Sequence, residues 1–256
     1  MAMDYRYECL PELEGQPVRK RIVVLTGAGI SAESGLPTYR TEDFSLWVEN
    51  DCINLATPQG FSKNPAAVLD FYNRRRRQLA QAQPNHAHRL LAELEKWHDV
   101  TIITQNVDDL HERAGSTDVI HVHGEITKVT SSVCRTDPAC IRELPLDVPI
   151  RLGDTAADGS QLRPNVVWFG EEVYDYGKSR KIVREADIFL VIGTSLKVTP
   201  AANLIKCPLP SAMKYIIDPC EPFDPYDDNY PEGYEHIREK ATVGMEILID
   251  RLMQLE

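Results

Sequence analysis

GAGISAESGLPTYR, residues 27–40, directly follows the apolar run RIVVLT of residues 21–26. Its fourteen residues include three glycines, two serines and one proline. A buried strand that leads through a glycine turn into a short helix is typical of α/β folds built around a parallel sheet. We therefore expect residues 21–26 to form a central strand and the glycine stretch to form the turn after it.

Four further β-branched runs have the character of buried strands. Each is apolar throughout rather than alternating in polarity, as strands covered on both faces of a parallel sheet are. Helical segments with recognisable ends lie between them, because Asn85 can cap one helix and Gly115 can end another. The predicted fold class is therefore a doubly wound α/β sheet. The four runs are VTIIT (100–104), VIHV (119–122), DIFLVIG (187–193) and KYIID (214–218).

Two segments interrupt this pattern. Residues 38–84 have helical character with no strand, and residues 128–162 are rich in Thr, Ser, Asp, Pro and Gly. We expect these two insertions to form a smaller second lobe. The larger domain then comprises residues 1–37, 85–127 and 163–256.

Composition limits the classes of function. With 256 residues, 43% of them hydrophobic, the chain can bury one substantial core and carry a small second lobe. The net charge of −11 and the single basic tract, RRRR at 74–77, argue against a nucleic-acid partner. The start of the chain, MAMDYRYECL, is charged where a signal peptide is apolar, and no apolar run has membrane length. The six cysteines form no disulfide framework, so we expect a cytoplasmic protein that contacts no membrane.

The glycine stretch also suits a phosphate ligand. After a strand, Gly27 and Gly29 can let a pyrophosphate approach backbone N–H groups at the start of a helix. A tight turn without a ligand explains the same glycines. An ordinary dehydrogenase needs a second strand that ends in an acid about 20 residues further on, whereas TEDFSLWVEN at 41–50 has acids but no strand pattern. The stretch therefore predicts a dinucleotide site of an unusual kind.

Polar side chains gather after the second predicted strand. Gln105, Asn106 and Asp108 follow it directly, at the edge where open α/β sheets bind ligands. The amides can bind ribose hydroxyls, and the carboxylate can accept from a carboxamide such as that of nicotinamide. Capping of the next helix by Asn106 or Asp108 explains one of these residues but not all three.

Two histidines occur in the next predicted strand, within VIHVHGEI at 119–126. His121 and His123 share one face of it, and Gly124 is expected to end it. A lone strand histidine is more often structural than functional. A histidine at a strand end beside a glycine can act as a base near neutral pH, so His123 is our candidate general base.

Six ordered motifs of the chain resemble those of the sirtuins, the family of NAD-dependent protein-lysine deacylases. The resemblance extends from about residue 23 to about residue 249. It implies a Rossmann-type domain and a small lobe with NAD between them. It also implies transfer of an acyl group from lysine to ADP-ribose, with release of nicotinamide. The motifs are GAGIS, SGLPTYR, TQNVDDLHERAG, HVHGE, VVWFGE and GTSLKVTPAANL.

The resemblance also implies roles for individual residues. His123 is the expected general base, and Asn106 is its expected catalytic partner at the ribose. Acyl-lysine proteins or peptides are expected to bind as an added strand. The expected NAD-binding residues are Gly27, Ala28, Gly29, Ile30, Arg40, Gln105, Asn106, Asp108, Gly193, Thr194, Ser195, Asp218 and Ala241. The expected substrate-binding residues are Tyr72, Arg75, Val167, Phe169, Gly170, Glu171 and Val198.

One pair of these residues predicts which acyl groups are removed. Tyr72 and Arg75 lie three residues apart on a helix that Asn64 and Pro65 should begin. Sirtuins that remove succinyl, malonyl or glutaryl groups carry a similar Y-x-x-R pair, whose phenol and guanidinium can bind the acyl carboxylate. The resemblance therefore predicts desuccinylase or demalonylase activity beside deacetylase activity. The other arginines of the tract, Arg74, Arg76 and Arg77, are expected to form a solvated helix face.

The chain departs from the family pattern at its metal site. Sirtuins usually hold a structural zinc ion with four cysteines of the small lobe, and the equivalent positions here carry only one, Cys134. Cys140 and His121 could in principle join it, but a closed zinc site needs four well-spaced ligands, so we expect no zinc. The four positions are Ser131, Cys134, Thr155 and Asp158.

Two other functions are compatible with parts of the sequence. A non-catalytic sensor of NAD or ADP-ribose would share the dinucleotide residues, and it differs from an enzyme in whether His123 and Asn106 are placed for catalysis. An NAD-dependent oxidoreductase would need a ribose-binding acid and a substrate domain, and the sequence indicates neither.

Overall fold

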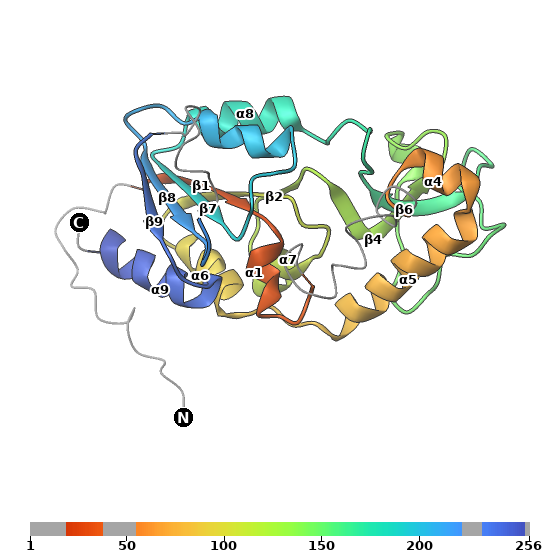
Figure 1. Cartoon of the computed structure of the whole chain (residues 1–256), viewed down its shortest axis with the longest axis horizontal. Helices are drawn as coiled ribbons and strands as arrows, with labels where there is room; N and C mark the ends of the chain where they lie inside the picture. The colour runs from red at the N-terminus through yellow and green to blue at the C-terminus, as the bar shows by residue number, and fades with distance from the viewer. Residues whose placement is uncertain (1–18, 38–54, 222–231, 254–256) are drawn as a thin grey trace.

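A six-stranded parallel sheet forms the centre of the molecule (Figure 1). The computed structural model of the chain describes residues 19–37, 55–221 and 232–253. The strands follow the order β3-β2-β1-β7-β8-β9, and every neighbouring pair is parallel. The sheet grows outward from β1 to one edge and from β7 to the other, which is the doubly wound topology. The strands are β1 (Arg21–Thr26), β2 (Asp99–Thr104), β3 (Val119–His121), β7 (Ile188–Ile192), β8 (Met213–Ile217) and β9 (Tyr234–Ile237).

The structure confirms the predicted fold class and the five predicted strands. The sixth, β9, lies at the edge of the sheet and has no such signature in the sequence. Glu235 is exposed and only Ile237 is buried, so β9 lacks the continuous apolar run that marks the other strands.

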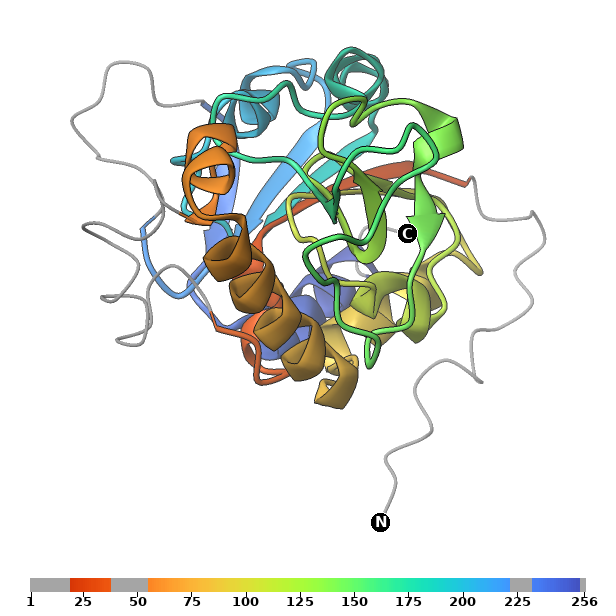
Figure 2. The ribbon, with the colours of Figure 1, turned by 90° about the vertical axis from the view of Figure 1, so that its right-hand side faces the viewer.

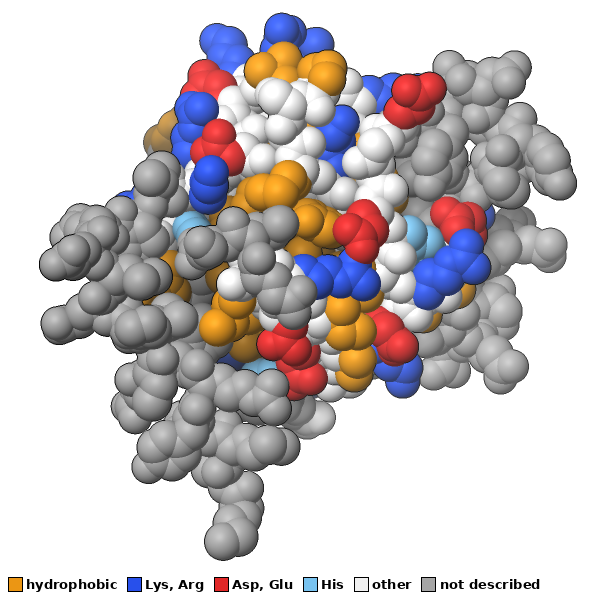
Figure 3. Space-filling view, turned by 90° about the vertical axis from the view of Figure 1, so that its left-hand side faces the viewer, with side chains coloured by type: hydrophobic (Ala, Val, Ile, Leu, Met, Phe, Trp, Pro, Cys, Tyr) orange, Lys and Arg blue, Asp and Glu red, His pale blue; other side chains and the backbone are white. Residues whose placement is uncertain are grey.

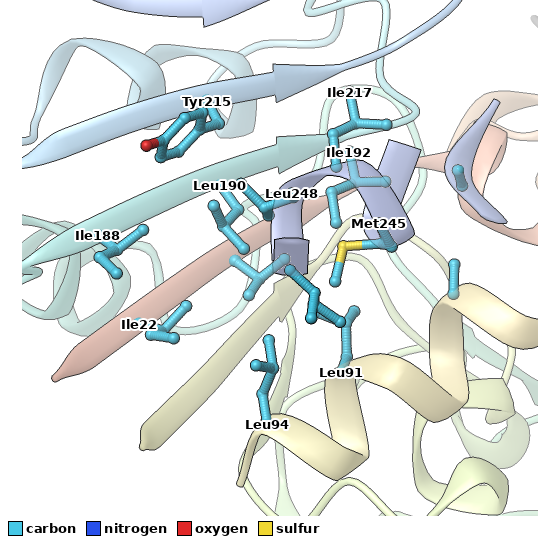
Figure 4. Packing of buried hydrophobic residues seen from close by; sticks show 14 of the residues in the cluster. Ile22, Leu91, Leu94, Ile188, Leu190, Ile192, Tyr215, Ile217, Met245 and Leu248 are labelled. Atoms are coloured by element: carbon cyan, nitrogen blue, oxygen red, sulfur yellow. The ribbon is translucent and has the colours of Figure 1, made fainter. Parts of the chain in front are cut away.

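Helices α6 (His86–Leu94) and α9 (Ala241–Leu252) cover one face of the sheet (Figure 1). Ile22 of the central strand, Leu91 of α6 and Met245 of α9 belong to one cluster of buried side chains, which Figure 4 shows from close by. All three side chains are fully buried. The cluster therefore joins the two helices to the central strands.

Helix α8 (Tyr176–Arg184) and the short 3-10 helix η3 (Ala201–Lys206) cover the opposite face. Val23 and Phe189 of the sheet pack there against Leu204. Successive residues of the central strands thus enter different clusters. This two-sided burial explains why these strands are apolar throughout.

The predicted helix ends are confirmed at two helices that support the candidate site. The side chain of Asn85 accepts a hydrogen bond from the backbone N–H of Ala87 at 3.0 Å, which caps the start of α6. Helix α7 (Leu110–Ala114) ends at Gly115, whose φ of 109° places it in the left-handed region that favours glycine.

A second, smaller group of elements lies at the far end of the molecule from α9 (Figures 1 and 2). It contains an antiparallel sheet in the order β5-β4-β6 and two helices that lie against it. β4 begins at Gly124 and so crosses the lobe boundary expected at residue 128; the division into two lobes stays a prediction. The elements are α4 (Pro58–Lys63), α5 (Pro65–Gln81), β4 (Gly124–Ser131), β5 (Arg142–Glu143), β6 (Leu162–Val166) and the 3-10 helix η2 (Pro138–Cys140).

Polar side chains fix α5 to the rest of this group. The Asn73 side chain exchanges two hydrogen bonds of 2.9 Å with the backbone of Ile150. Arg76 is fully buried and donates to the carbonyl oxygens of Ile126, Leu144 and Pro145. The prediction that Arg76 belongs to a solvated face is therefore wrong, because backbone carbonyls distant in sequence satisfy its guanidinium in the interior.

Arg74 and Arg77 do follow that prediction, since both are exposed. Arg74 pairs with Asp70 one turn earlier on α5 at 2.7 Å. On the face drawn in Figure 3, acidic and basic side chains of described residues are interspersed and form no continuous basic area. Within the described residues, no helix combines the length and apolarity that crossing a membrane requires.

Candidate active site

Two adjoining cavities lie at the carboxyl ends of the central strands, the edge where doubly wound sheets bind ligands. The glycine cavity is named here for Gly27, Gly29 and Gly193 in its wall. The tryptophan cavity is named for Trp168 and is also lined by α5. The residues that line both cavities are Ala28, Gln105, Asn106, His123 and Val198.

The residues expected to bind NAD gather mainly in the glycine cavity. Asp108 lines the tryptophan cavity instead. Ile30 lines neither, because its side chain is buried in the core beneath the turn. Arg40 lies outside the described residues. The glycine cavity is lined by Gly27, Ala28, Gly29, Gln105, Asn106, Gly193, Thr194, Ser195, Asp218 and Ala241.

All the residues expected to bind the acyl-lysine substrate line the tryptophan cavity. Trp168 and Ser31 also line it, although sequence reasoning did not select them. The VVWFGE and GAGIS motifs contain these two residues and could have indicated them. The expected residues found there are Tyr72, Arg75, Val167, Phe169, Gly170, Glu171 and Val198.

The glycines of the first cavity bring two turns into backbone contact. Gly29 N–H donates to Gly193 O at 2.7 Å. A Cβ on Gly29 would lie 2.6 Å from the Cα of Gly193, and Gly193 itself has a φ of +61°. Any larger side chain at Gly29 would therefore push the start of α1 (Ala28–Ala32) away from the end of β7. The glycines are therefore needed for the tight turn itself, and the same turn also forms the wall of a cavity.

The Asn106 side chain is held through its amide nitrogen. Its Nδ2 donates to Gly27 O and to Ser31 Oγ, both at 3.1 Å, and its backbone N–H donates to Thr104 Oγ1 at 3.0 Å. No described residue hydrogen-bonds to its Oδ1. Asn106 does not cap α7, and it lines both cavities. Its Oδ1 can accept a hydrogen bond from a ligand hydroxyl at the junction of the cavities.

Asp108 is a buried carboxylate beside Asn106. Ser31 Oγ donates to its Oδ2 at 3.1 Å, and the backbone N–H of Leu110 donates to its Oδ1 at 3.2 Å. The second bond shows that Asp108 does contact the start of α7, as the capping alternative requires. Burial raises the pKa of Asp108 to about 6 against these hydrogen bonds. The carboxylate is therefore ionised at neutral pH and can accept an N–H from a ligand amide.

His123 has the tautomer that a general base requires. Its Nδ1 lies 2.9 Å from the carbonyl oxygen of Gln105, and because a carbonyl only accepts, Nδ1 carries the proton. Its Nε2 is then the basic nitrogen, on a side chain that lines both cavities. Burial lowers the pKa of His123, which keeps the ring neutral near pH 7.

The local backbone of His123 differs from the expected strand end. β3 ends at His121 and β4 begins at Gly124, so His123 occupies the short turn between two strands. Gly124 has a φ of +78°, and a Cβ there would lie 2.1 Å from the carbonyl oxygen of Asn165. The glycine therefore starts the second sheet rather than ending the first, and its close contact with β6 fixes the turn.

Trp168 forms a rigid wall of the tryptophan cavity. Its indole Nε1 donates to the Tyr72 hydroxyl oxygen at 3.0 Å, and its backbone N–H donates to Glu171 Oε2 at 2.7 Å. The Arg163 guanidinium lies over its ring and pairs with Glu171 at 2.7 Å. The Glu171 carboxylate is thus engaged within the protein. Arg75 lies on the same helix as Tyr72, with its guanidinium 5.6 Å from the centre of the Phe71 ring.

The positions equivalent to the family's zinc ligands do not fit a zinc ion. Ser131 Oγ donates to Asp158 Oδ2 at 2.6 Å and accepts from the backbone N–H of Cys134 at 2.7 Å. Thr155 pairs with Gln161 in an isolated β-bridge. A single thiol among two hydroxyls and a carboxylate is not the four-ligand N/S set of a structural zinc site. His121 lies at the end of β3 in the large sheet, where Glu112 and Asn106 occupy its ring nitrogens.

Comparison with known proteins agrees with this arrangement. The model of the Sir2 family matches residues 27–200. An NAD-dependent protein deacylase of Bacteroides thetaiotaomicron is 49% identical over 90% of this chain and 96% of its own length. One of Helicobacter pylori is 47% identical over 92% of this chain and 99% of its own length.

Solved structures of Sir2 homologues also resemble this chain. A mutant of a Sir2 homologue in complex with ADP-ribose superposes with a TM-score of 0.76 at 36% identity, covering 92% of this chain and 93% of that one. A complex of a Sir2 homologue with NAD has a TM-score of 0.73 at 36% identity, covering 92% and 90%. The chain belongs to the Sir2 family.

Proposed function

We propose that this chain is an NAD-dependent protein-lysine deacylase that removes succinyl and malonyl groups as well as acetyl groups. The observation that carries the proposal is the junction of the two cavities at His123 and Asn106. One cavity is lined by glycines and the ends of parallel strands, as a dinucleotide site is. The other is bounded by aromatic side chains that suit the stem of an acylated lysine.

The reaction follows from what each cavity can hold. NAD bound in the glycine cavity would be held with its ribose beside Asn106 and His123 and its carboxamide near Asp108. The acyl oxygen of the lysine attacks C1′ of that ribose, nicotinamide leaves, and an alkylimidate forms. His123 Nε2 then takes the proton of a ribose hydroxyl, whose oxygen attacks the imidate carbon. Water completes the release of lysine and O-acyl-ADP-ribose, while Asn106 Oδ1 orients the ribose.

The acyl preference rests on Tyr72 and Arg75. Both belong to α5 and both line the tryptophan cavity. The buried side chains of Asn73 and Arg76 fix the rotation of α5 about its axis, so that this pair points toward the cavity. A phenol and a guanidinium can donate charge-assisted hydrogen bonds to the carboxylate of a succinyl or malonyl group, whereas an acetyl group has no carboxylate to accept them.

A panel of acyl-lysine peptides tests both the NAD-dependent deacylation and the acyl preference. Purified protein is incubated with NAD and with acetyl, malonyl, succinyl or glutaryl peptides, and the products are measured by mass spectrometry. We expect deacylation only with NAD, and succinyl and malonyl peptides among the substrates. Without any deacylation, the chain would be a sensor of NAD or ADP-ribose.

A matched pair of variants tests the acyl preference separately from the deacylase activity. Arg75→Met should raise KM for succinyl peptides by about 10- to 100-fold, the loss of one charged hydrogen bond, and leave deacetylation unchanged. Arg74→Met removes an exposed neighbouring arginine that pairs with Asp70, and it should change neither activity. If Arg75→Met lowers both activities equally, Arg75 is structural and the acyl preference is refuted. The cytoplasmic location and the absence of a nucleic-acid partner stay predictions.

A further inference from the structure

His121 has contacts that the deacylation chemistry does not use. It is the last residue of β3, and its side chain is 7% exposed. Its Nδ1 lies 3.1 Å from the carbonyl oxygen of Asn106, and its Nε2 lies 2.7 Å from the Oε1 of Glu112 on α7. The ring therefore connects a helix to the backbone of a residue at the junction of the cavities.

The two contacts of His121 determine its charge. A backbone carbonyl can only accept a hydrogen bond, and so can an ionised carboxylate. A neutral imidazole has a single N–H and can donate to one of them. Both bonds form together only when both ring nitrogens carry protons, so the geometry requires an imidazolium. His123 differs, because only its Nδ1 contacts a carbonyl.

The groups around His121 favour this charge. Glu112 of α7 and Glu125 of β4 face it with negative charge, and Asp108 and His111 also lie within electrostatic range. Burial alone would lower the pKa of His121, but the hydrogen bond and charge of Glu112, the charge of Glu125 and the hydrogen bond to Asn106 together outweigh it and raise the pKa overall. Burial drives the pKa of His111 well below its usual value, so that ring adds no competing charge at neutral pH.

The contact with Asn106 gives this charge a role in the reaction. The N–H of Asn106 is fixed by Thr104, and its carbonyl is fixed by His121. We propose that protonated His121 is a positioning residue that holds the loop between β2 and α7, residues 105–109, in the conformation that presents Asn106 and Asp108 to NAD. A neutral His121 must release either Asn106 or Glu112. The proposal rests on the proposed function, because the loop's ligand is NAD.

Glu112→Gln is the variant that tests the charge. The amide keeps an oxygen in place but removes the negative charge that stabilises the imidazolium. We expect the alkaline limb of the pH profile of kcat/KM for NAD to move about one pH unit lower, which is a loss of about tenfold on that limb. Glu93→Gln removes an exposed carboxylate of α6 that pairs with Lys96, and it should leave the profile unchanged.

A second variant distinguishes positioning from simple structural support. His121→Gln keeps one donor that does not titrate, so we expect a lower kcat/KM for NAD with this alkaline limb abolished. A uniform loss at every pH with the limb retained would overturn the proposal. So would a Glu112→Gln profile that coincides with the wild type.

NMR titration of the histidine rings measures the charge without any turnover. In the wild-type protein, the His121 ring should remain protonated at pH 7, and Glu112→Gln should lower its titration midpoint. A His121 ring that is neutral at pH 7 would refute the proposal even if the chain is an active deacylase. Conversely, a protonated His121 in a chain without deacylase activity would show that the proposed function, and not the charge state, is in error.

Discussion

His123 Nδ1 lies 2.9 Å from the carbonyl oxygen of Gln105, and the two side chains line both cavities. The contact joins the turn after β3 to the segment after β2, two places that sequence patterns identify separately. It fixes the proton on Nδ1 and leaves Nε2 as the base. The histidine is thus oriented by the same segment that carries Asn106.

This orientation predicts a large effect of removing the ring. His123→Ala should reduce kcat by about 10²- to 10⁴-fold, as loss of a general base does, while NAD still binds. The measurement is steady-state deacylation of an acetyl peptide together with NAD binding by calorimetry. His86→Ala is the control, because His86 is half-buried on α6 and lines neither cavity. Turnover of His123→Ala near the wild-type rate would exclude His123 as the base.

Asp108 should make activity fall in acid. Its pKa is raised to about 6 by burial, and the ionised carboxylate accepts a stronger hydrogen bond from the nicotinamide amide than the neutral carboxyl does. Affinity for NAD should therefore be full above about pH 7 and decline as the pH falls through 6. Asp108→Asn should weaken NAD binding at neutral pH, whereas Asp109→Asn, beside Arg113, should not. Equal NAD affinity of wild type and Asp108→Asn would contradict this role.

Ionisation of Asp108 should also lower the stability of the fold as the pH rises, whereas it strengthens NAD binding. A carboxyl whose pKa is higher in the folded protein than in the unfolded chain binds its proton more tightly when folded. Its ionisation therefore destabilises the fold, by nothing below about pH 4 and by about 3 kcal/mol above pH 6. We expect Asp108→Asn to unfold at a higher temperature than wild type at pH 7. A lower unfolding temperature would show that the hydrogen bonds of the carboxylate outweigh its burial.

Local patterns predicted those parts of the fold that depend on local chemistry. Asn85 and Gly115 cap helices because their own side chain or conformation suits the position. The buried strands are recognisable because both faces of the sheet are covered. The pairing of β4 could not be predicted in this way, because its partner β6 lies far along the chain. In the antiparallel pair, Thr130 of β4 lies opposite Arg163 of β6. Nothing near β4 in the sequence indicates that pairing.

The candidate site shows the same limit. Gln105, Asn106 and Asp108 lie within four residues of sequence, so their cluster could be predicted. The burial of Arg76 could not, because its acceptors at Ile126 and Leu144 come from elements that only the fold brings together. A run of four arginines has no local feature that separates a buried member from exposed ones.

Two buried histidines predict loss of stability in acid. His88 and His111 are fully buried with their ring centres 4.9 Å apart. Burial lowers the pKa of His88 to about 4 and that of His111 well below its usual value. An unfolded histidine titrates near 6.5, so the folded protein binds fewer protons. The stability contribution is full above about pH 6.5 and is lost progressively as the pH falls toward 4.

Thermal unfolding across pH measures this effect. For His88 alone, the loss between pH 6.5 and 4 should reach about 3 kcal/mol. His88→Gln cannot be protonated and should show a shallower decline of unfolding temperature than wild type. His86→Gln, at a half-buried position of the same helix, should decline as the wild type does. Parallel curves for wild type and His88→Gln would show that His88 is not buried as a neutral ring.

Hydrogen bonds between Ser131, Asp158 and Ser160 hold part of the smaller group of elements together without zinc. Ser131 Oγ donates to Asp158 Oδ2, and Ser160 Oγ donates to Asp158 Oδ1 at 2.7 Å. These bonds connect β4 to the segment before β6, where the family's zinc would join the same positions. A metal cannot contribute folding free energy here if only Cys134 can ligate it as a thiolate.

We therefore expect protein purified without added zinc to contain far less than one equivalent of metal by elemental analysis. A chelator should change neither its unfolding temperature nor its deacylase activity, because hydrogen bonds already satisfy these side chains. A variant with cysteine at Ser131, Thr155 and Asp158 restores the family's ligand set beside Cys134 and should retain about one zinc ion, which controls for the assay. Stoichiometric zinc in the wild type, with unfolding on chelation, would mean that other residues of the chain build a metal site.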